Sequence, residues 1–303
     1  MKHRRTRLLF LLLVCVILLK VNVELNPAAA HESSHQPIHT LTGDIRFHKQ
    51  FHSRFLPTDR DLIVYLPPDY ERDHTKRYPV LYMQDGQNIF DVATCFWPGF
   101  ERHFDERAEY LIAKKEIQPL IIVGIYSTEL ERINEYTPTP AVYNYRGGDA
   151  NLYARMLVEE IKPFIDCEYR TLPSRENTGL GGASLGGLVS MYIGLKYPET
   201  FGKLAVSSPA AYWDDEMIVQ DVKRTALRKL PKVFLSVGRG EPNLFVSSTR
   251  DLHQALESNG WRNGANLAYF EPPVSEHRPG AWTSGVDLLL EFLFPGRKPM
   301  GRR

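Results

Sequence analysis

Residues 182–186 carry the pattern in this chain that is best suited to do chemistry, Gly-x-Ser-x-Gly with Ser184 at its centre. Residues 177–181 before it favour a short strand, and the apolar residues 188–196 after it favour a helix. A tight glycine turn between strand and helix lifts the serine hydroxyl above the sheet edge. We therefore expect Ser184 to be a nucleophile; the alternative is a helix cap or a small packing residue.

A serine hydroxyl needs a base within hydrogen-bond reach, and that base is usually a histidine. After a serine in this context, the acid and then the histidine follow along the chain. Only His253 and His277 follow Ser184. His253 falls in a helical segment and is expected at the surface, whereas His277 lies in a loop between the last strand and the last helix. We expect His277 to be the base.

The acid that orients the histidine should follow the strand ending near Val237. Glu241 lies there, in the glycine-containing loop 238–241. Its alternative role is a surface ion pair with Arg239 or Arg250. Other carboxylates could replace it as the acid: Asp214, Asp215 and Asp251.

The oxyanion of an acyl transfer needs backbone N–H donors. One should come from Leu185, the residue after the nucleophile, and another from the loop 84–88 after the third strand. Gly86 lets the backbone turn there, so Gln87 N–H is the first choice and Gly86 N–H the second. The alternative for residues 85–86 is a simple turn.

The chain of 303 residues has 43% hydrophobic and 24% charged residues and a formal charge of +1. This composition is ordinary for a globular protein with a large core. The near-neutral charge, and the lack of basic stretches interleaved with aromatic residues, argue against nucleic-acid binding. We expect one catalytic domain over residues 43–296 and a short tail over 297–303.

The N-terminus differs from the rest of the chain. A basic head precedes the apolar run 8–19, and three alanines follow at 28–30. Residues 1–30 are therefore predicted to be a signal peptide or an uncleaved N-terminal anchor, followed by a linker over 31–42. Either version predicts an exported protein, which is periplasmic, secreted or anchored facing outside. Any membrane contact would be made only by the uncleaved segment.

Cysteine and histidine positions give no metal site. Cys15 lies in the apolar run, which leaves Cys95 and Cys167 either as a disulfide or as two separate thiols. His31, His35 and His39 are spaced by four but fall in the predicted linker, where solvated side chains are expected.

Hydrophobic patterns alternate between strand and helix along the domain. Strands are expected at 43–51, 60–66, 78–83, 120–126, 177–181, 204–207, 232–237 and 266–270. Helices are expected at 101–115, 149–164, 188–196, 248–258 and 282–294. This order predicts an α/β fold with a mostly parallel central sheet, helices on both faces and antiparallel strands at the N-terminal edge. The candidate residues then follow strand ends, where ligands bind in such sheets.

Several segments together resemble the putative-esterase family of α/β-hydrolases, which includes esterase D, enterochelin esterases, feruloyl and acetyl-xylan esterases and mycolyltransferases. The segments are YPVLYMQDGQNIFD at 78–91, the helix around 160–169, residues 181–188 with KYPETFG at 196–202, SPAAYW at 208–213 and HRPGAW at 277–282. The resemblance covers residues 42–296. It implies the α/β-hydrolase fold and an acyl-ester hydrolase with Ser184 and His277 in the catalytic positions; Glu241 matches less securely.

Together these observations predict a serine carboxylic-ester hydrolase that needs no metal or cofactor. The expected substrate is a small-molecule or glycan ester, carbohydrate-linked or phenolic (feruloyl or acetyl). The aromatic residues Trp97, Tyr212, Trp213 and Trp282 would line its pocket, or else pack in the core. Alternatives are a siderophore trilactone esterase of the enterochelin type, an acyltransferase, and a non-catalytic binding module on the same fold.

Overall fold

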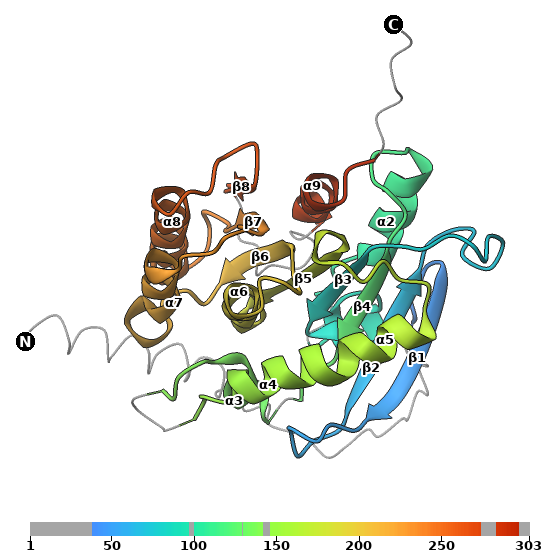
Figure 1. Ribbon diagram of the computed structural model, residues 1–303, viewed down its shortest axis with the longest axis horizontal. Helices are drawn as coiled ribbons and strands as arrows, with labels where there is room; N and C mark the ends of the chain where they lie inside the picture. The colour runs from blue at the N-terminus through green and yellow to red at the C-terminus, as the bar shows by residue number, and fades with distance from the viewer. Residues whose placement is uncertain (1–37, 97–99, 129, 142–145, 274–282, 297–303) are drawn as a thin grey trace, which may run out of the picture. The chain divides into compact units, whose positions relative to one another are not determined.

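The computed structural model describes residues 38–96, 100–128, 130–141, 146–273 and 283–296. Within them, one eight-stranded sheet runs through the centre in the order β1-β2-β4-β3-β5-β6-β7-β8 (Figure 1). Its strands are β1 (Asp44–Phe51), β2 (Arg60–Leu66), β3 (Val80–Gln84), β4 (Ile121–Ile125), β5 (Thr178–Ser184), β6 (Lys203–Pro209), β7 (Lys232–Ser236) and β8 (Leu267–Phe270).

The sheet is antiparallel only at its N-terminal side. Ile45 pairs with Tyr65 between β1 and β2, and Tyr65 pairs with Ile122 between β2 and β4, both antiparallel. The pairings from β4 through β3 to β8 are all parallel. The predicted α/β fold with antiparallel strands at this edge is thereby confirmed.

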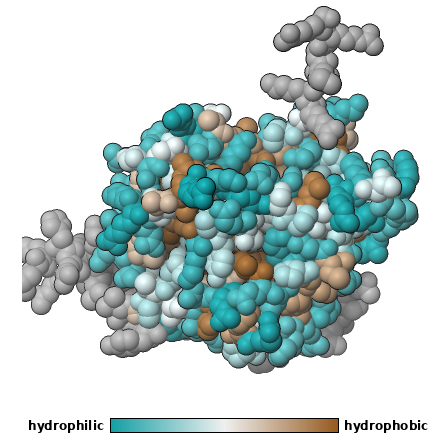
Figure 2. All heavy atoms as spheres, viewed as in Figure 1, coloured by the Kyte–Doolittle hydropathy of each residue, from teal (hydrophilic) through white to brown (hydrophobic). Residues whose placement is uncertain are grey.

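Successive side chains of the central strands enter two different cores. In β3, Tyr82 joins the core on one face of the sheet, while Leu81 and Met83 join the core on the other. A strand that is buried on both faces reads as a continuous apolar run, because alternate side chains point to opposite faces. The face of the molecule seen in Figure 2 is mostly hydrophilic with scattered hydrophobic patches, which agrees with this burial.

Helices cover both faces. One core receives side chains from α4 (Ala150–Met156), α5 (Lys162–Glu168), α6 (Leu185–Lys196), α7 (Trp213–Arg224) and α8 (Asn243–Ser258). The other receives them from α2 (Phe104–Ala113) and α9 (Thr283–Leu293). Short helical segments complete the described elements: η1 (Gly86–Asn88), η2 (Val92–Thr94), α3 (Arg132–Tyr136), η3 (Leu157–Ile161) and η4 (Arg175–Asn177).

Three helical features differ from the sequence-based expectation. The helix predicted at 149–164 contains one π-helical turn, η3, between α4 and α5, and π turns inside α-helices are rare. The short α3 was not expected. Neither was α7, in which Asp214, Asp215 and Glu216 have left-handed backbone angles within the helical span.

The structure tests the prediction for the cysteines but not the one for the N-terminus. Cys95 and Cys167 are both free thiols, so the alternative of two separate thiols holds. Among the residues that the structure describes, no helix is long and apolar enough to cross a bilayer. Residues 1–30, on which the export prediction rests, lie outside those ranges.

Candidate active site

Ser184 is the last residue of β5, and α6 begins at the next residue. Its backbone angles are φ 56° and ψ −123°, in a region that side-chain-bearing residues rarely occupy. Such strain, of the order of 1–3 kcal/mol, persists only where the surrounding structure enforces it, and it concentrates at functional sites. The side chain is partly exposed, although the strand that carries it is buried.

Close packing around the turn explains the glycines of the pattern. A Cβ on Gly182 would lie 2.8 Å from the Gly186 carbonyl carbon, closer than side-chain atoms approach. A Cβ on Gly186 would lie 3.0 Å from Gln84 Cβ and 3.1 Å from Asp85 Oδ2. The first turn of α6 is therefore seated against the end of β3, as the strand–turn–helix interpretation predicts.

The neighbouring strand supports the turn. The Ala210 N–H donates to the Ser184 carbonyl oxygen over 3.0 Å, and the β5–β6 register shifts between Ala183 and Ser184. Leu185, the predicted oxyanion donor, is the first residue of α6 and is half-buried. The first N–H groups of an α-helix have no partner within the helix and attract negative charge. This position is suited to hold an oxyanion.

Glu241 is buried in the loop that follows β7. Only 5% of the residue is exposed, and its N–H donates to the Gly238 carbonyl oxygen over 3.0 Å. The alternative role as a surface partner of Arg239 or Arg250 does not match the structure, in which both arginines pair with Glu271. A carboxylate is buried at the predicted position, at the same sheet edge as Ser184.

Ser208 is a part of this arrangement that the sequence analysis missed. It lies near the end of β6, is fully buried, and has a left-handed φ of 38°. Its hydroxyl donates to Glu241 Oε1 over 2.9 Å. Although Glu241 follows β7, this bond holds its carboxylate beside the end of β6, the strand next to β5. In a triad, a histidine side chain lies between such an acid and the serine.

The other candidates for the base and the acid lie either outside the described residues or on helices α7 and α8. His277 lies outside the described residues, as do Trp97 and Trp282. His253 lies on α8, where its ring stacks on Tyr269 with centroids 4.2 Å apart. The alternative acids are all exposed, on α7 or α8: Asp214, Asp215 and Asp251.

The loop after β3 turns in an unexpected way. Asp85, not Gly86, has the left-handed conformation, with φ 57° and ψ 50°. Gly86 is required for a different reason, because a Cβ there would lie 2.5 Å from the Gly124 carbonyl carbon in β4. The expectation that Gly86 makes the turn is therefore corrected: this glycine allows two backbones to approach closely.

Gln87 is fixed by its side chain. Its Nε2 donates to Ser127 Oγ over 2.9 Å, and its Oε1 accepts from Ser127 N–H over 3.2 Å. The bonds within η1 begin with Asn88 N–H, which donates to the Asp85 carbonyl oxygen. The N–H groups of Gly86 and Gln87 precede that bond, the position from which the start of a helix presents donors to an anion.

An ion pair between the half-buried Arg132 and the buried Asp85 supports this loop. Arg132 on α3 donates to both carboxylate oxygens of Asp85, over 2.7 and 2.8 Å. Burial by itself would raise the pKa of Asp85, but the charge and hydrogen bonds of Arg132 outweigh it and hold that pKa below its usual value. Asp85 N–H also donates to the Tyr136 hydroxyl over 3.3 Å. The loop is preorganised by a pair that the sequence analysis did not identify.

The two described aromatic candidates follow β6. Trp213 Nε1 donates to the carbonyl oxygen of Thr139 over 3.1 Å. The Tyr212 ring contacts Phe245 edge to face, with centroids 4.9 Å apart. Both side chains are half-buried and have packing partners, so each has a structural role whether or not it also lines a pocket.

Curated proteins similar to this chain include esterases. The protein YjcH of Bacillus subtilis, described as uncharacterized, is 29% identical over 255 residues, covering 81% of this chain and 94% of that protein. An endo-1,4-beta-xylanase/feruloyl esterase of Xylanibacter ruminicola is 29% identical over 161 residues, covering 51% of this chain and 20% of its own length. The iron(III) salmochelin esterase of Escherichia coli is 28% identical over 161 residues, covering 52% of this chain and 34% of that protein.

The fold is shared with solved hydrolases. An IroE-like serine hydrolase from Shewanella oneidensis superposes with a TM-score of 0.68 at 19% identity, covering 83% of this chain and 80% of that one. The family model described as "Putative esterase" matches residues 53–271, which span β2 to the residue after β8. The predicted resemblance is thereby confirmed: the chain belongs to the Putative esterase family and is an esterase with an α/β-hydrolase fold.

Proposed function

We propose that this protein is a serine carboxylic-ester hydrolase in which Ser184 is the nucleophile. The observation that carries the proposal is the strained, positive-φ backbone of Ser184 between a buried strand and the start of α6, enclosed by close-packed glycines. A strained serine at a strand-to-helix junction presents its hydroxyl to a substrate above the sheet. The buried Glu241 at the same edge supports a triad.

In this mechanism, Ser184 Oγ attacks the ester carbonyl carbon while the His277 imidazole accepts the hydroxyl proton. The tetrahedral oxyanion accepts hydrogen bonds from Leu185 N–H and Gln87 N–H, with Gly86 N–H as the alternative to Gln87. His277 then protonates the leaving alcohol, and afterwards activates the water that releases the acid. Glu241 orients the imidazole and stabilises its charged form.

The proposed substrate is a carbohydrate-linked or phenolic ester, of the feruloyl or acetyl type. The relative named as a xylanase and feruloyl esterase supports this class. The aromatic side chains of Tyr212 and Trp213, after β6, supply apolar surface of the kind that stacks on sugar or phenolic rings. We also propose that residues 1–30 direct export, which would place the enzyme where such esters occur.

A siderophore trilactone is the second candidate substrate. The relative named as a salmochelin esterase favours it. Both candidates are carboxylic esters, so the same serine chemistry would cleave either one.

Hydrolysis rates across an ester panel test this proposal. The panel comprises p-nitrophenyl acetate, methyl ferulate, an acetylated xylo-oligosaccharide and a catecholate trilactone, each with the wild type and with Ser184→Ala. We expect kcat/KM to be highest for a phenolic or sugar ester and to fall at least about 10³-fold in the variant. Preference for the trilactone would select the second candidate, and equal rates for wild type and variant would remove Ser184 from the mechanism.

A further inference from the structure

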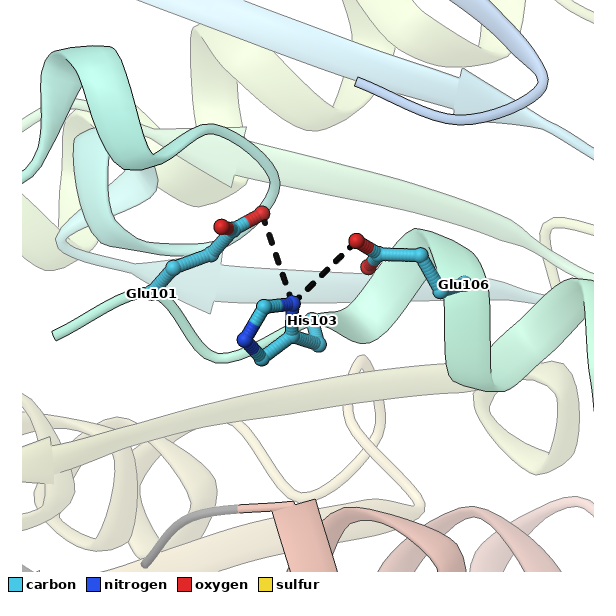
Figure 3. Close-up of side chains that lie close together, drawn as sticks. All are labelled: Glu101, His103 and Glu106. Carbon is cyan, nitrogen blue, oxygen red and sulfur yellow. Dashed lines mark hydrogen bonds and ion pairs between the residues drawn. The ribbon is translucent and has the colours of Figure 1, made fainter. Parts of the chain in front are cut away.

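Three side chains outside the candidate active site converge near the start of α2. Glu101, His103 and Glu106 each point one potential metal-ligand atom toward the same place (Figure 3). His103 Nδ1 lies 3.7 Å from Glu101 Oε1 and 3.1 Å from Glu106 Oε1. All three ligand atoms lie within 4.8 Å of one another.

The backbone fixes this convergence. His103 precedes α2 with left-handed angles, φ 54° and ψ 37°, and Glu106 follows in the first turn of that helix. On either side of His103, Arg102 N–H donates to the Asn88 carbonyl oxygen over 3.0 Å and Phe104 N–H donates to that of Ile89 over 3.2 Å. The segment that carries the cluster is therefore hydrogen-bonded to Asn88, the last residue of η1, and to Ile89.

Glu101 provides an independent indication of a missing ligand. Only 2% of this residue is exposed. Its Oε2 accepts from Thr40 Oγ1 over 2.8 Å, but its Oε1 is buried without a hydrogen-bond donor among the described residues, and it faces His103. Leaving a buried carboxylate oxygen without a partner is costly.

One imidazole proton cannot satisfy this site. A single Nδ1–H on His103 would have to serve two carboxylates, Glu101 Oε1 and Glu106 Oε1. Two further buried oxygens, Asp105 Oδ1 and Glu106 Oε2, are explained by the hydrogen bond that the Asp105 and Glu106 carboxyl groups share. Glu101 Oε1 is different: when His103 Nδ1–H serves Glu106 Oε1, no donor among the described residues is left for it, and a cation can occupy a centre that these acceptors share.

We propose that Glu101 Oε1, His103 Nδ1 and Glu106 Oε1 bind a divalent transition-metal cation, with Zn²⁺ as the best match. Zinc takes imidazole nitrogen and carboxylate oxygen at about 2.0–2.2 Å, which separates tetrahedral ligands by about 3.4 Å. The distances of 3.1 and 3.7 Å bracket that value. The side chains of His103 and Glu106 are 35% and 32% exposed, which leaves an entry path and a fourth position for water.

The proposed role of this ion is structural. It would join the loop residue Glu101 to the first turn of α2, beside the backbone bonds that hold η1 in place. Because Gln87 is part of η1, the bound ion would stiffen the loop that carries the proposed oxyanion donor. It takes no part in the proposed ester chemistry.

Zn²⁺ titration by calorimetry of the chelator-treated full chain tests the proposal. His103→Asn is the main variant, because asparagine tolerates a left-handed backbone and should leave the fold intact. Glu101→Gln is the second variant. His52→Asn is the matched control, since His52 is exposed and its Nδ1 lies 2.8 Å from a single carboxylate oxygen of Asp59.

We expect the wild type and the control to bind one Zn²⁺ more than either variant, or to bind it at least about 10-fold more tightly. In the Co²⁺-loaded wild type, we expect the visible absorption of a tetrahedral site, and we expect Glu101→Gln and His103→Asn to lack it. Equal stoichiometry and affinity in the wild type and both variants would overturn the proposal, as would an absence of Zn²⁺ binding by the wild type. Comparing variants separates this site from any zinc held by other histidines.

Discussion

Replacing Glu241 by glutamine removes one buried negative charge while it keeps the shape of the site. The carboxylate is 5% exposed and accepts from Ser208 Oγ over 2.9 Å. A glutamine carbonyl oxygen can accept the same bond, so we expect little loss of stability. The variant therefore isolates the charge that would stabilise the imidazolium of His277 in the transition state.

The size of the effect follows from burial. Two unit charges about 4 Å apart interact by about 4 kcal/mol at an effective dielectric constant of about 20, the value that suits partly buried sites. A loss of about 4 kcal/mol in transition-state stabilisation lowers the rate by about 10³-fold. The low exposure of Glu241 means that salt should screen this interaction weakly.

The assay is kcat for p-nitrophenyl acetate with Glu241→Gln and a matched control, Glu271→Gln. Glu271 is a carboxylate just after β8 that pairs with Arg250 over 2.6 Å, so its removal should change kcat by less than about threefold. Thermal unfolding of both variants checks that they fold. If Glu241→Gln retained kcat within threefold of the wild type while folding normally, Glu241 would not be the acid of the triad.

Three further substitutions test the supports of the site. Ser208→Ala removes the hydroxyl donor to the buried acid, and a bond to a charged group contributes about 1.5–3 kcal/mol, so kcat should fall about 10-fold or more. Arg132→Met leaves Asp85 buried without its partner and should lower the free energy of unfolding by about 3–5 kcal/mol in urea titrations. Because the pKa of Asp85 is lowered in the folded state, the stability from this pair is present above pH ~4 and is lost as the pH falls through the folded-state pKa. Gly182→Ala places a methyl group 2.8 Å from the Gly186 carbonyl carbon, and we expect it to destabilise the fold by about 1–3 kcal/mol and to lower activity.

Each of these variants has an outcome that would contradict the reasoning. Ser190→Ala is the control for Ser208→Ala, because Ser190 is fully buried and its hydroxyl has no partner among the described residues. Equal activity of the two variants would show that the bond to Glu241 is unimportant. An Arg132→Met protein as stable as the wild type, or an active and stable Gly182→Ala protein, would show that the site tolerates changes the structure forbids.

The sheet could be predicted from the sequence because its central strands are buried on both faces. Such strands read as short apolar runs, and the strand expected at 60–66 has the observed bounds of β2. The π turn η3 could not be predicted, because one extra residue in a single helical turn leaves no distinct signal in a short apolar pattern. The short α3 is five residues long, too few for periodicity to reveal it.

The candidate site could be predicted where its residues follow a known order along the chain, but not where their roles depend on contacts between distant residues. Glu241 could be predicted from its place in the loop after β7, and the structure places its carboxylate in the interior. Ser208 begins the SPAAYW segment of the family resemblance, but its role could not be predicted because the bond to Glu241 joins positions 33 residues apart. The pairing of Asp85 with Arg132 joins positions 47 residues apart, which spacing along the chain does not reveal.

The most direct test of the central claim is covalent labelling of the folded full chain by a fluorophosphonate, with the modified peptide identified by mass spectrometry. We expect one adduct, on Ser184, that is absent in Ser184→Ala and strongly reduced in His277→Ala. A folded wild-type protein that stays unlabelled, or an adduct on another residue that persists in Ser184→Ala, would contradict this expectation.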